Sequence, residues 1–328
     1  MTQFIKISIL GLYFFGLGTT FTRAGDIELG RVNWLRSLKK GQELAKESGK
    51  PLLILFQEVP GCSTCKNYGI GPLSHPLLVE AIEQYFIPVC IHNNKNGPDK
   101  EALQLFQEPS WNNPVIRIVD KDFKDILGRL AGDYSAYGLV SKINSALVVR
   151  GIKIPGYLNL LEQEFRVNQF GSSQATFGMY CFWSGEKTFG KLDGVIATNA
   201  GYMGGSEVVT IQYDPSKIGL DELIKIGKSQ NNADRLFTNE NLKNNSIPIK
   251  KPSAFRQDAE TKYYLYKSDY KYIPMTDMQA TKLNAALGNG LKDDSMLSPK
   301  QIQYYNSIKD KDKSKLKNQI GKGIVDGW

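Results

Sequence analysis

The sequence has little of what several specialised classes of protein require. Its 328 residues include only two histidines and four cysteines, the latter at positions 62, 65, 90 and 181. Four cysteines in a chain this long do not make a disulfide scaffold, and the histidines complete no tetrahedral zinc site. The net charge is +8, but basic residues are interleaved with acids. The sequence therefore has no cluster of basic residues of the kind that binds nucleic acid. The cysteines are therefore expected to include working thiols.

Long apolar runs are also absent, except near the N-terminus. Residues 1–24 contain Lys6, an apolar run over 7–18 and a small-residue end at Ala24, which is typical of a secretory signal peptide cleaved after Ala24. The run is shorter than the ~20 residues of a spanning helix. We expect an exported chain, periplasmic or extracellular, without stable membrane insertion. Its charge falls to +6 when Lys6 and Arg23 are removed.

The remaining length predicts two domains. Residues 151–156 join them, since Pro155 opposes continuation of the preceding helix. The expected division is a first domain over 25–150, a second over 151–235, and a C-terminal extension over 236–328 that packs on the second domain. The extension ends in a basic, polar tail from residue 309.

The first domain places two cysteines where a strand meets a helix. After a helix over 34–48 and an apolar strand over 52–56 comes Cys62-Ser-Thr-Cys65, at the start of the next helix. In this position the first thiol is exposed and acidified, and the second can close a ring on it. Further elements are expected at 85–91 and 115–119 (strands) and at 137–149 (helix). Cys90 is expected in the core, and His75 and His92 at the surface.

Residues 27–149 resemble the thioredoxin fold. The resemblance implies an α/β domain in which a cis-proline packs against the active thiols, and Asn113-Pro114 occupies that place. The Val59-Pro-Gly-Cys62 sequence is similar to a bacterial subfamily in which some members have selenocysteine at the position of Cys62. That implies redox activity at Cys62.

The second domain has one cysteine, also at a strand-to-helix junction. A strand over 174–179 is followed by Cys181 and a helix over 182–190. The helix dipole and free N–H groups favour a thiolate there. Phe182 and Trp183 can place apolar surface beside the sulfur. Glu207, the first residue of a later strand, could hydrogen-bond an oxygen of the substrate. Such a site suits a small substrate with a methyl group and a polar oxygen.

These motifs resemble the A-type peptide methionine sulfoxide reductases. Cys181-Phe-Trp-Ser-Gly-Glu186 is followed by Gly201-Tyr-Met-Gly-Gly205 and by Glu207-Val-Val, in the order of that family's signature. The resemblance covers residues 175–230 and implies an α+β sandwich. Three features depart from the family: Tyr180 replaces a glycine, the segment between Gly205 and Glu207 that carries a pocket tyrosine is missing, and the later Gly-Thr-Gln-Tyr-Arg-Ser segment has no clear counterpart except the tyrosine-rich run over 263–272.

The resemblance implies roles for the site residues. Cys181 would attack the sulfur of oxidised methionine in peptides or proteins, and Glu207 would give a proton to its oxygen. Phe182, Trp183 and Tyr202 would bind the substrate. No cysteine follows Cys181, so the Cys62/Cys65 dithiol of the same chain is expected to recycle it, with an external thiol donor and no cofactor or metal.

Two other functions remain open from the sequence. The chain could be a thiol-disulfide oxidoreductase whose second domain only binds a client, since the pocket segment is missing. It could also be a non-catalytic binding protein with a structural Cys62–Cys65 disulfide. A metal half-site at these cysteines is disfavoured because zinc needs four ligands.

The C-terminal extension carries two helix starts with capping boxes, at Thr276 and Ser298. They predict helices over 278–287 and 299–308. The tyrosines over 263–272 alternate as in a strand with one aromatic face, for which packing is the expected role. The tail from residue 309 is expected to be a solvated helix end or disordered.

Overall fold

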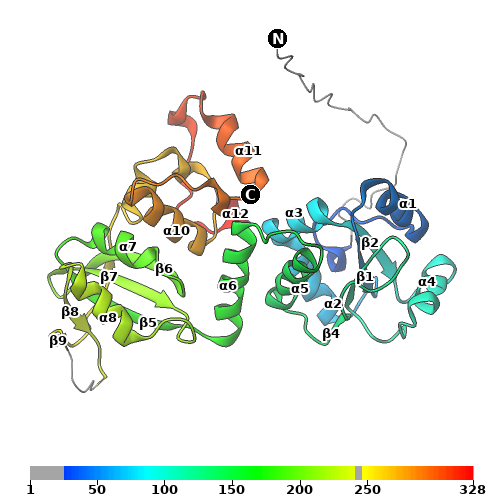
Figure 1. The fold of residues 1–328 in the computed structure, drawn as a ribbon, viewed down its shortest axis with the longest axis horizontal. Helices are drawn as coiled ribbons and strands as arrows, with labels where there is room; N and C mark the ends of the chain where they lie inside the picture. The colour runs from blue at the N-terminus through cyan, green and yellow to red at the C-terminus, as the bar shows by residue number, and fades with distance from the viewer. Residues whose placement is uncertain (1–25, 241–245, 328) are drawn as a thin grey trace, which may run out of the picture.

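The computed structural model describes residues 26–240 and 246–327, which form two lobes (Figure 1). The predicted signal peptide, residues 1–24, lies outside the described residues. Among the residues that are described, no helix is long and apolar enough to cross a membrane.

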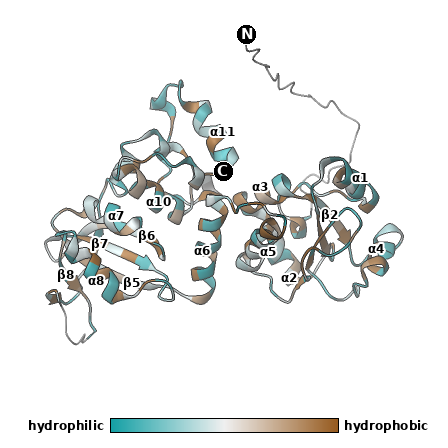
Figure 2. Cartoon of the chain, in the orientation of Figure 1, coloured by the Kyte–Doolittle hydropathy of each residue, from teal (hydrophilic) through white to brown (hydrophobic). Residues whose placement is uncertain are grey.

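The first lobe is built on a four-stranded sheet in the order β2-β1-β3-β4. β1 runs parallel to β2 and antiparallel to β3, and every residue of β1 is buried. These central strands carry the strongest hydrophobic colour of the lobe (Figure 2). The strands are β1 (Leu52–Gln57), β2 (Ile87–His92), β3 (Val115–Val119) and β4 (Leu130–Ala131).

Helices cover both faces of this sheet, which is why β1 is apolar without alternation. On one face lie α1 (Leu38–Ser48) and α4 (Pro98–Phe106), which pack on Ile54 and Phe56. On the other face lie α2 (Ser63–Ile70), α3 (Pro76–Tyr85) and α5 (Ala136–Val149). The predicted strand over 115–119 is confirmed, whereas the first helix starts at Leu38 instead of residue 34, because the Ser37 hydroxyl caps it by accepting from Lys40 N.

The second lobe holds a six-stranded sheet in the order β10-β6-β7-β5-β8-β9. All neighbouring strands are antiparallel except β8 and β9. The strands are β5 (Ser173–Met179), β6 (Val195–Met203), β7 (Ser206–Tyr213), β8 (Ala233–Phe237), β9 (Ile249–Lys250) and β10 (Arg256–Gln257). Helices α7 (Phe182–Gly190) and α8 (Leu220–Ser229) pack against the sheet. The mixed α/β architecture matches the sequence prediction.

The C-terminal extension forms α9 (Tyr263–Tyr266), α10 (Asp277–Gly288), α11 (Pro299–Ile308) and α12 (Ile324–Gly327). Both predicted capping boxes are present. The predicted strand over 263–272 is wrong: α9 is followed by a 3-10 turn, Asp269–Tyr272. The tyrosines do not share one face, because Tyr263 stacks on Trp183 while Tyr270 is buried in another cluster with Leu265.

The end of the chain is not simply solvated, which corrects the expectation for the tail. Gln319 N donates to Lys271 O, and Ile324 on α12 is buried in the core of the first lobe. An apolar side chain among charged residues was enough to dock the segment.

Helix α6 (Gly156–Phe170) connects the lobes. Tyr157, Leu158 and Leu161 belong to the first lobe's core. Leu160 and Val167 instead pack with Ile196 of β6 and Met278 of α10. The helix therefore has one apolar face in each lobe, and separating the lobes would expose both.

A buried carboxylate also joins the lobes. Glu80 on α3, 4% exposed, accepts from Ser298 Oγ at 2.6 Å and from Lys300 N at 2.8 Å. These donors lie at the N-terminus of α11, where the helix dipole favours negative charge. A side chain of the first lobe thus caps a helix of the C-terminal extension.

Glu80→Ala should lower the free energy of unfolding by about 1–3 kcal/mol, since the substitution leaves buried donors without an acceptor. Urea unfolding measures the change. Glu47→Ala, on the exposed side of α1, is the matched control and should stay within about 0.5 kcal/mol of wild type. Equal stability of the two variants would contradict a structural role for Glu80.

Candidate active site

Cys181 lies where β5 ends and α7 begins. It is the N-cap residue of α7, with extended backbone (φ −145°), and its side chain makes no capping hydrogen bond. The helix spans Phe182–Gly190, as predicted. Cys181 is half-buried, and Tyr180 before it is exposed. The sulfur thus lies at a helix N-terminus and is reachable from solvent.

Glu207 reaches the same helix terminus. Its Oε2 accepts a hydrogen bond from Phe182 N at 3.0 Å. A tight hairpin places it there: Gly204 and Gly205, with φ of 57° and 78°, form a two-residue turn, so Glu207 pairs with Tyr202 across β6 and β7. The missing family segment is replaced by this turn, which only residues tolerant of positive φ can make.

Aromatic rings surround this end of α7. Phe182 contacts Trp183 at 5.4 Å and Tyr202 at 5.3 Å between ring centroids. The structure therefore brings together the three residues predicted to bind substrate. Arg256 of β10 lies over the Tyr202 ring at 4.3 Å, which places a cation beside the aromatic group.

The C-terminal extension completes the aromatic wall. Tyr263 stacks on Trp183 with ring centroids 3.9 Å apart. The indole Nε1 of Trp183 donates to Asp258 Oδ2 at 3.1 Å. The indole is thus held on its face and at its nitrogen. The sequence alone did not predict that Tyr263 and Asp258 contact Trp183. The tyrosine-rich run over 263–272 was the one signal, as the candidate counterpart of the Gly-Thr-Gln-Tyr-Arg-Ser segment.

Tyr264 brings a hydroxyl-bearing ring toward the cysteine. Burial raises the pKa of Tyr264, and the nearby negative charges of Cys181, Tyr263 and Glu186 raise it further. The phenol therefore stays protonated at neutral pH and can donate a hydrogen bond. The position fits the kind of group that the missing family segment would have supplied.

Glu186 of α7 holds these pieces together. Its fully buried carboxylate accepts from Ala200 N of β6 (3.2 Å), Thr261 Oγ1 (3.2 Å) and Lys262 N (2.8 Å). Lys262 Nζ lies 3.7 Å from Glu186 Oε1 and donates to Thr198 O. Burial raises the pKa of Glu186 and lowers the pKa of Lys262. One carboxylate thus links α7, β6 and the start of α9.

The dithiol of the first lobe has one exposed and one buried member. Cys62 is the N-cap residue of α2, and its Sγ lies 3.6 Å from Sγ of buried Cys65. Cys65 Sγ donates to Asn113 Oδ1 at 2.7 Å, and Pro114 follows through a cis peptide bond, as predicted. The buried thiol can attack Cys62 without movement of the backbone.

The two thiols titrate in opposite directions. The backbone N–H of Cys65 lowers the pKa of Cys62, because it stabilises the thiolate. Burial raises the pKa of Cys65 to about 11. Cys62 is therefore the more readily ionised thiol of the pair at neutral pH.

The remaining cysteine and the two histidines are buried or half-buried in the first lobe. Cys90 is fully buried in β2, as predicted, and burial raises its pKa to about 12. His75 is not the surface residue that was expected: its ring packs edge-on against Phe165, and burial lowers its pKa to about 4. His92 is half-buried, and its pKa is lowered mainly by burial.

Glu58 adds a carboxylate to the dithiol. Its oxygen and the sulfurs of Cys62 and Cys65 lie within 4.8 Å of one another. Three such atoms are one fewer than the tetrahedral shell of structural zinc requires. Glu58 therefore places a carboxylate beside the two thiols of Cys62 and Cys65.

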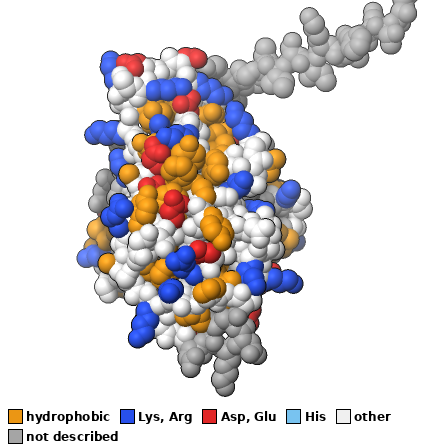
Figure 3. Space-filling view, turned by 90° about the vertical axis from the view of Figure 1, so that its left-hand side faces the viewer, with side chains coloured by type: hydrophobic (Ala, Val, Ile, Leu, Met, Phe, Trp, Pro, Cys, Tyr) orange, Lys and Arg blue, Asp and Glu red, His pale blue; other side chains and the backbone are white. Residues whose placement is uncertain are grey.

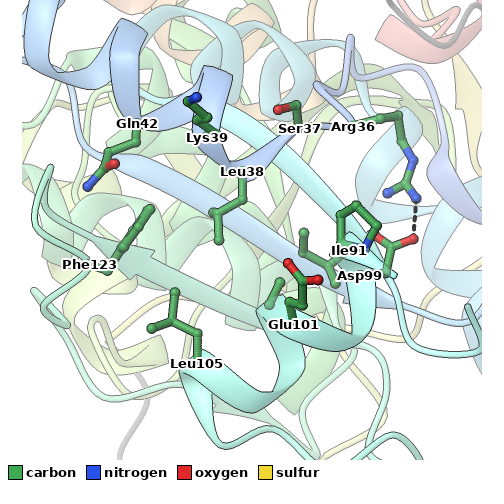
Figure 4. A pocket seen from close by; sticks show the side chains of 12 residues that line it. Arg36, Ser37, Leu38, Lys39, Gln42, Ile91, Asp99, Glu101, Leu105 and Phe123 are labelled. Atoms are coloured by element: carbon green, nitrogen blue, oxygen red, sulfur yellow. Dashed lines mark hydrogen bonds and ion pairs between the residues drawn. The ribbon is translucent and has the colours of Figure 1, made fainter. Parts of the chain in front are cut away.

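A hollow of about 440 Å³ lies elsewhere in the first lobe, between α1 and α4 (Figure 4). Leu38, Ile91 and Leu105 line it, and the Arg36–Asp99 ion pair closes one end. No cysteine is among the residues that line it. It is separate from both thiol centres.

Each lobe thus holds cysteine at the start of a helix: Cys62 and Cys65 at α2, and Cys181 at α7. Residues 173–235 match the family model described as peptide methionine sulfoxide reductase. This confirms the resemblance inferred for Cys181 and its surroundings.

Individual relatives match the same part. The chain is 41% identical over 70 residues to the peptide methionine sulfoxide reductase MsrA of Geobacter metallireducens, covering 16% of this chain and 43% of that protein. It is 39% identical over 69 residues to MsrA of Thermoactinomyces vulgaris, covering 16% of this chain and 56% of the relative. The chain therefore spans only about half, or less, of these relatives.

Solved structures align with part of the chain. A DsbH oxidoreductase is 19% identical, covers 40% of this chain and 94% of its own, and has a TM-score of 0.32. A thioredoxin from Thermus thermophilus is 18% identical, covers 36% and 88%, and has a TM-score of 0.31. The thioredoxin-like character of the first lobe is visible directly in its sheet order, its dithiol at a helix start and its cis-proline.

The titration of the dithiol predicts selective alkylation. At pH 7 the thiolate fraction of a thiol with a pKa of about 11 is on the order of 10⁻⁴, so iodoacetamide should label Cys62 at least ~100 times faster than Cys65. Labelling of Cys65, followed in Cys62→Ser by peptide mass mapping, should rise as the pH approaches 11. Similar rates for both thiols at pH 7 would contradict the assignment of Cys62 as the more readily ionised thiol.

Proposed function

We propose that this chain is a thiol-dependent reductase of methionine sulfoxide. The observation that supports this most directly is the group at the start of α7: Cys181 as N-cap, Glu207 bonded to the next N–H, and Phe182 and Trp183 as an aromatic wall. An apolar wall accommodates the methyl group, and polar hydrogens near the sulfur bind the oxygen.

In the first step Cys181 attacks the sulfur of the sulfoxide. The bond formed between the two sulfurs then breaks as the oxygen moves from the substrate sulfur to Cys181: the substrate's S–O bond is lost, an S–O bond to Cys181 forms, and the products are a sulfenic acid on Cys181 and the thioether. Glu207 supplies a proton to the oxygen as this occurs. In this proposal Tyr264 and Tyr202 hydrogen-bond the same oxygen, while Asp258 and Tyr263 hold the Trp183 ring.

In the second step the Cys62/Cys65 dithiol restores Cys181. Cys62 attacks the Cys181 sulfur, a mixed disulfide forms and water leaves. Cys65 then attacks Cys62, which frees the Cys181 thiolate and leaves a Cys62–Cys65 disulfide. The dithiol has supplied two electrons, and an external thiol donor must return them.

The substrate we propose is oxidised methionine in peptides or proteins. Cys181 is half-buried and borders exposed Tyr180, so a residue within a longer chain can approach. We also propose that the chain is exported, on the basis of the signal-like residues 1–24.

A thiol-disulfide oxidoreductase remains the second candidate. It is favoured by the exposure of Cys62 and its lowered pKa, which would suit attack on a client's disulfide. In that function Cys181 would only border a client-binding surface. A sulfoxide assay separates the two, since disulfide exchange produces no methionine.

With dithiothreitol as reductant, the protein should convert a methionine sulfoxide peptide to methionine, and Cys181→Ser should abolish the conversion. Glu207→Gln should lower kcat by about 10²–10⁴-fold, because the amide still accepts from Phe182 N but cannot donate the proton of an acid. Product is measured by chromatography.

The matched control is Glu222→Gln, at an exposed position of helix α8, and it should retain full activity. Wild-type activity in Glu207→Gln would remove the proton-donor role. Activity that survives Cys181→Ser would contradict the assignment of the nucleophile.

A further inference from the structure

Few thiols of the chain are available to reduce an oxidised Cys181. Of the four cysteines, Cys90 is fully buried, which leaves Cys62 and Cys65 as the thiols that can resolve an oxidised Cys181. Only Cys62 of that pair is exposed. The resolving attack therefore requires the start of α2 to meet the start of α7.

The arrangement of the lobes keeps these two helix starts apart within one chain. Helix α2 lies in one lobe and α7 in the other, with α6 between them (Figure 1). α6 contributes to the cores of both lobes, Glu80 caps α11 across the junction, and Ile324 inserts into the first lobe. A meeting inside one chain would break these contacts, whereas a meeting of two chains would break none of them.

Each thiol centre also carries an exposed aromatic residue. Trp111 is 80% exposed and Tyr180 is 72% exposed, the two highest values among the large hydrophobic side chains that the structure describes. Trp111 lies in the loop that ends at Asn113, the hydrogen-bond partner of Cys65, and Tyr180 directly precedes Cys181. Both positions are fixed, since Asn93 Nδ2 donates to Asn112 O at 3.1 Å and Tyr180 N donates to Asn232 O at 3.0 Å.

Such residues are the usual anchors of protein contacts, because tryptophan and tyrosine bury much area at low entropic cost. Figure 3 shows that hydrophobic side chains gather on the outer face of the second lobe, with both acidic and basic groups among and around them. Charged groups flank both sulfurs: Glu58 lies beside Cys62, and Glu207, Asp258 and Arg256 surround the start of α7 at Cys181.

We propose that the resolving step occurs between two copies of this chain, with the Cys62–Cys65 surface of one copy docked on the Cys181 surface of another and with Trp111 and Tyr180 in the contact. This inference depends on the proposed function. Because each copy carries both surfaces, the contact is heterologous, and each chain can serve as donor and acceptor in turn.

The chemistry balances as an exchange between chains. Cys62 of the donor chain attacks the sulfenic sulfur of the acceptor, forming a Cys62–Cys181 disulfide and releasing water. Cys65 of the donor then attacks Cys62, forming the internal disulfide and returning Cys181 as thiolate. The donor loses two electrons, which a soluble dithiol replaces.

The test uses two complementary full-length variants. The donor is Cys65→Ser/Cys181→Ser, which keeps only Cys62 as an exposed thiol and cannot clear the mixed disulfide. The acceptor is Cys62→Ser/Cys65→Ser, labelled with ¹⁵N. After reductant is removed, the mixture receives methionine sulfoxide peptide, and peptide mass mapping searches for a Cys62–Cys181 bond between a light and a heavy chain.

The proposal predicts that this bond forms within one turnover. Its absence, when the acceptor has released about one methionine per chain, would overturn transfer between chains and leave the proposed function intact. An acceptor that releases no methionine would instead show that the proposed function has failed.

The aromatic contact is tested in the donor. Trp111→Ala should slow formation of the mixed disulfide about tenfold, the change expected from loss of one interface anchor. Leu105→Ala, another exposed hydrophobic residue of the same lobe, should leave the rate unchanged. Equal crosslinking rates for the two donors would remove Trp111 from the contact.

Discussion

The buried carboxylate of Glu186 is the interaction on which the arrangement of side chains around Cys181 depends. It joins the helix that begins after the nucleophile to β6 and to the segment that leads into α9. That segment carries Tyr263, which stacks on the Trp183 ring, and α9 is also held by Leu265 N, which donates to Asn284 Oδ1 of α10. A buried carboxylate is costly unless its hydrogen bonds are satisfied, and here backbone and side-chain donors from distant segments satisfy it. This arrangement is therefore assembled jointly by the matched region and the C-terminal extension.

The second constraint is the way the lobes are joined. Helix α6 divides its apolar residues between two cores, and Glu80 caps a helix that follows it by more than two hundred residues. A flexible linker would let the dithiol sample the Cys181 site of its own chain at high effective concentration. A shared helix removes that freedom. The same contacts that stabilise the molecule thus direct the exchange of electrons toward a neighbouring copy.

Local patterns in the sequence predicted much of the fold. The extents of α7 and α11, both capping boxes and the exposed and buried thiols of the dithiol follow from short-range chemistry, whereas the cis Asn113–Pro114 bond was implied by the resemblance to the thioredoxin fold. The alternating tyrosines were misread because their partners are distant in sequence: Trp183 for Tyr263, and a separate cluster for Tyr270. Asp258 and the role of Glu80 were missed for the same reason. The sequence around Asp258 does not indicate contact with the indole of Trp183, and the sequence around Glu80 does not indicate contact with the N-terminus of α11.

The stoichiometry of methionine release without added reductant tests the central claim most directly. Pre-reduced wild-type protein with excess methionine sulfoxide peptide should release about two methionines per chain, one from Cys181 and one after the dithiol has restored it. Cys62→Ser/Cys65→Ser should release about one, and Cys181→Ser none. One methionine per wild-type chain would contradict recycling by the dithiol, and none would contradict sulfoxide reduction at Cys181.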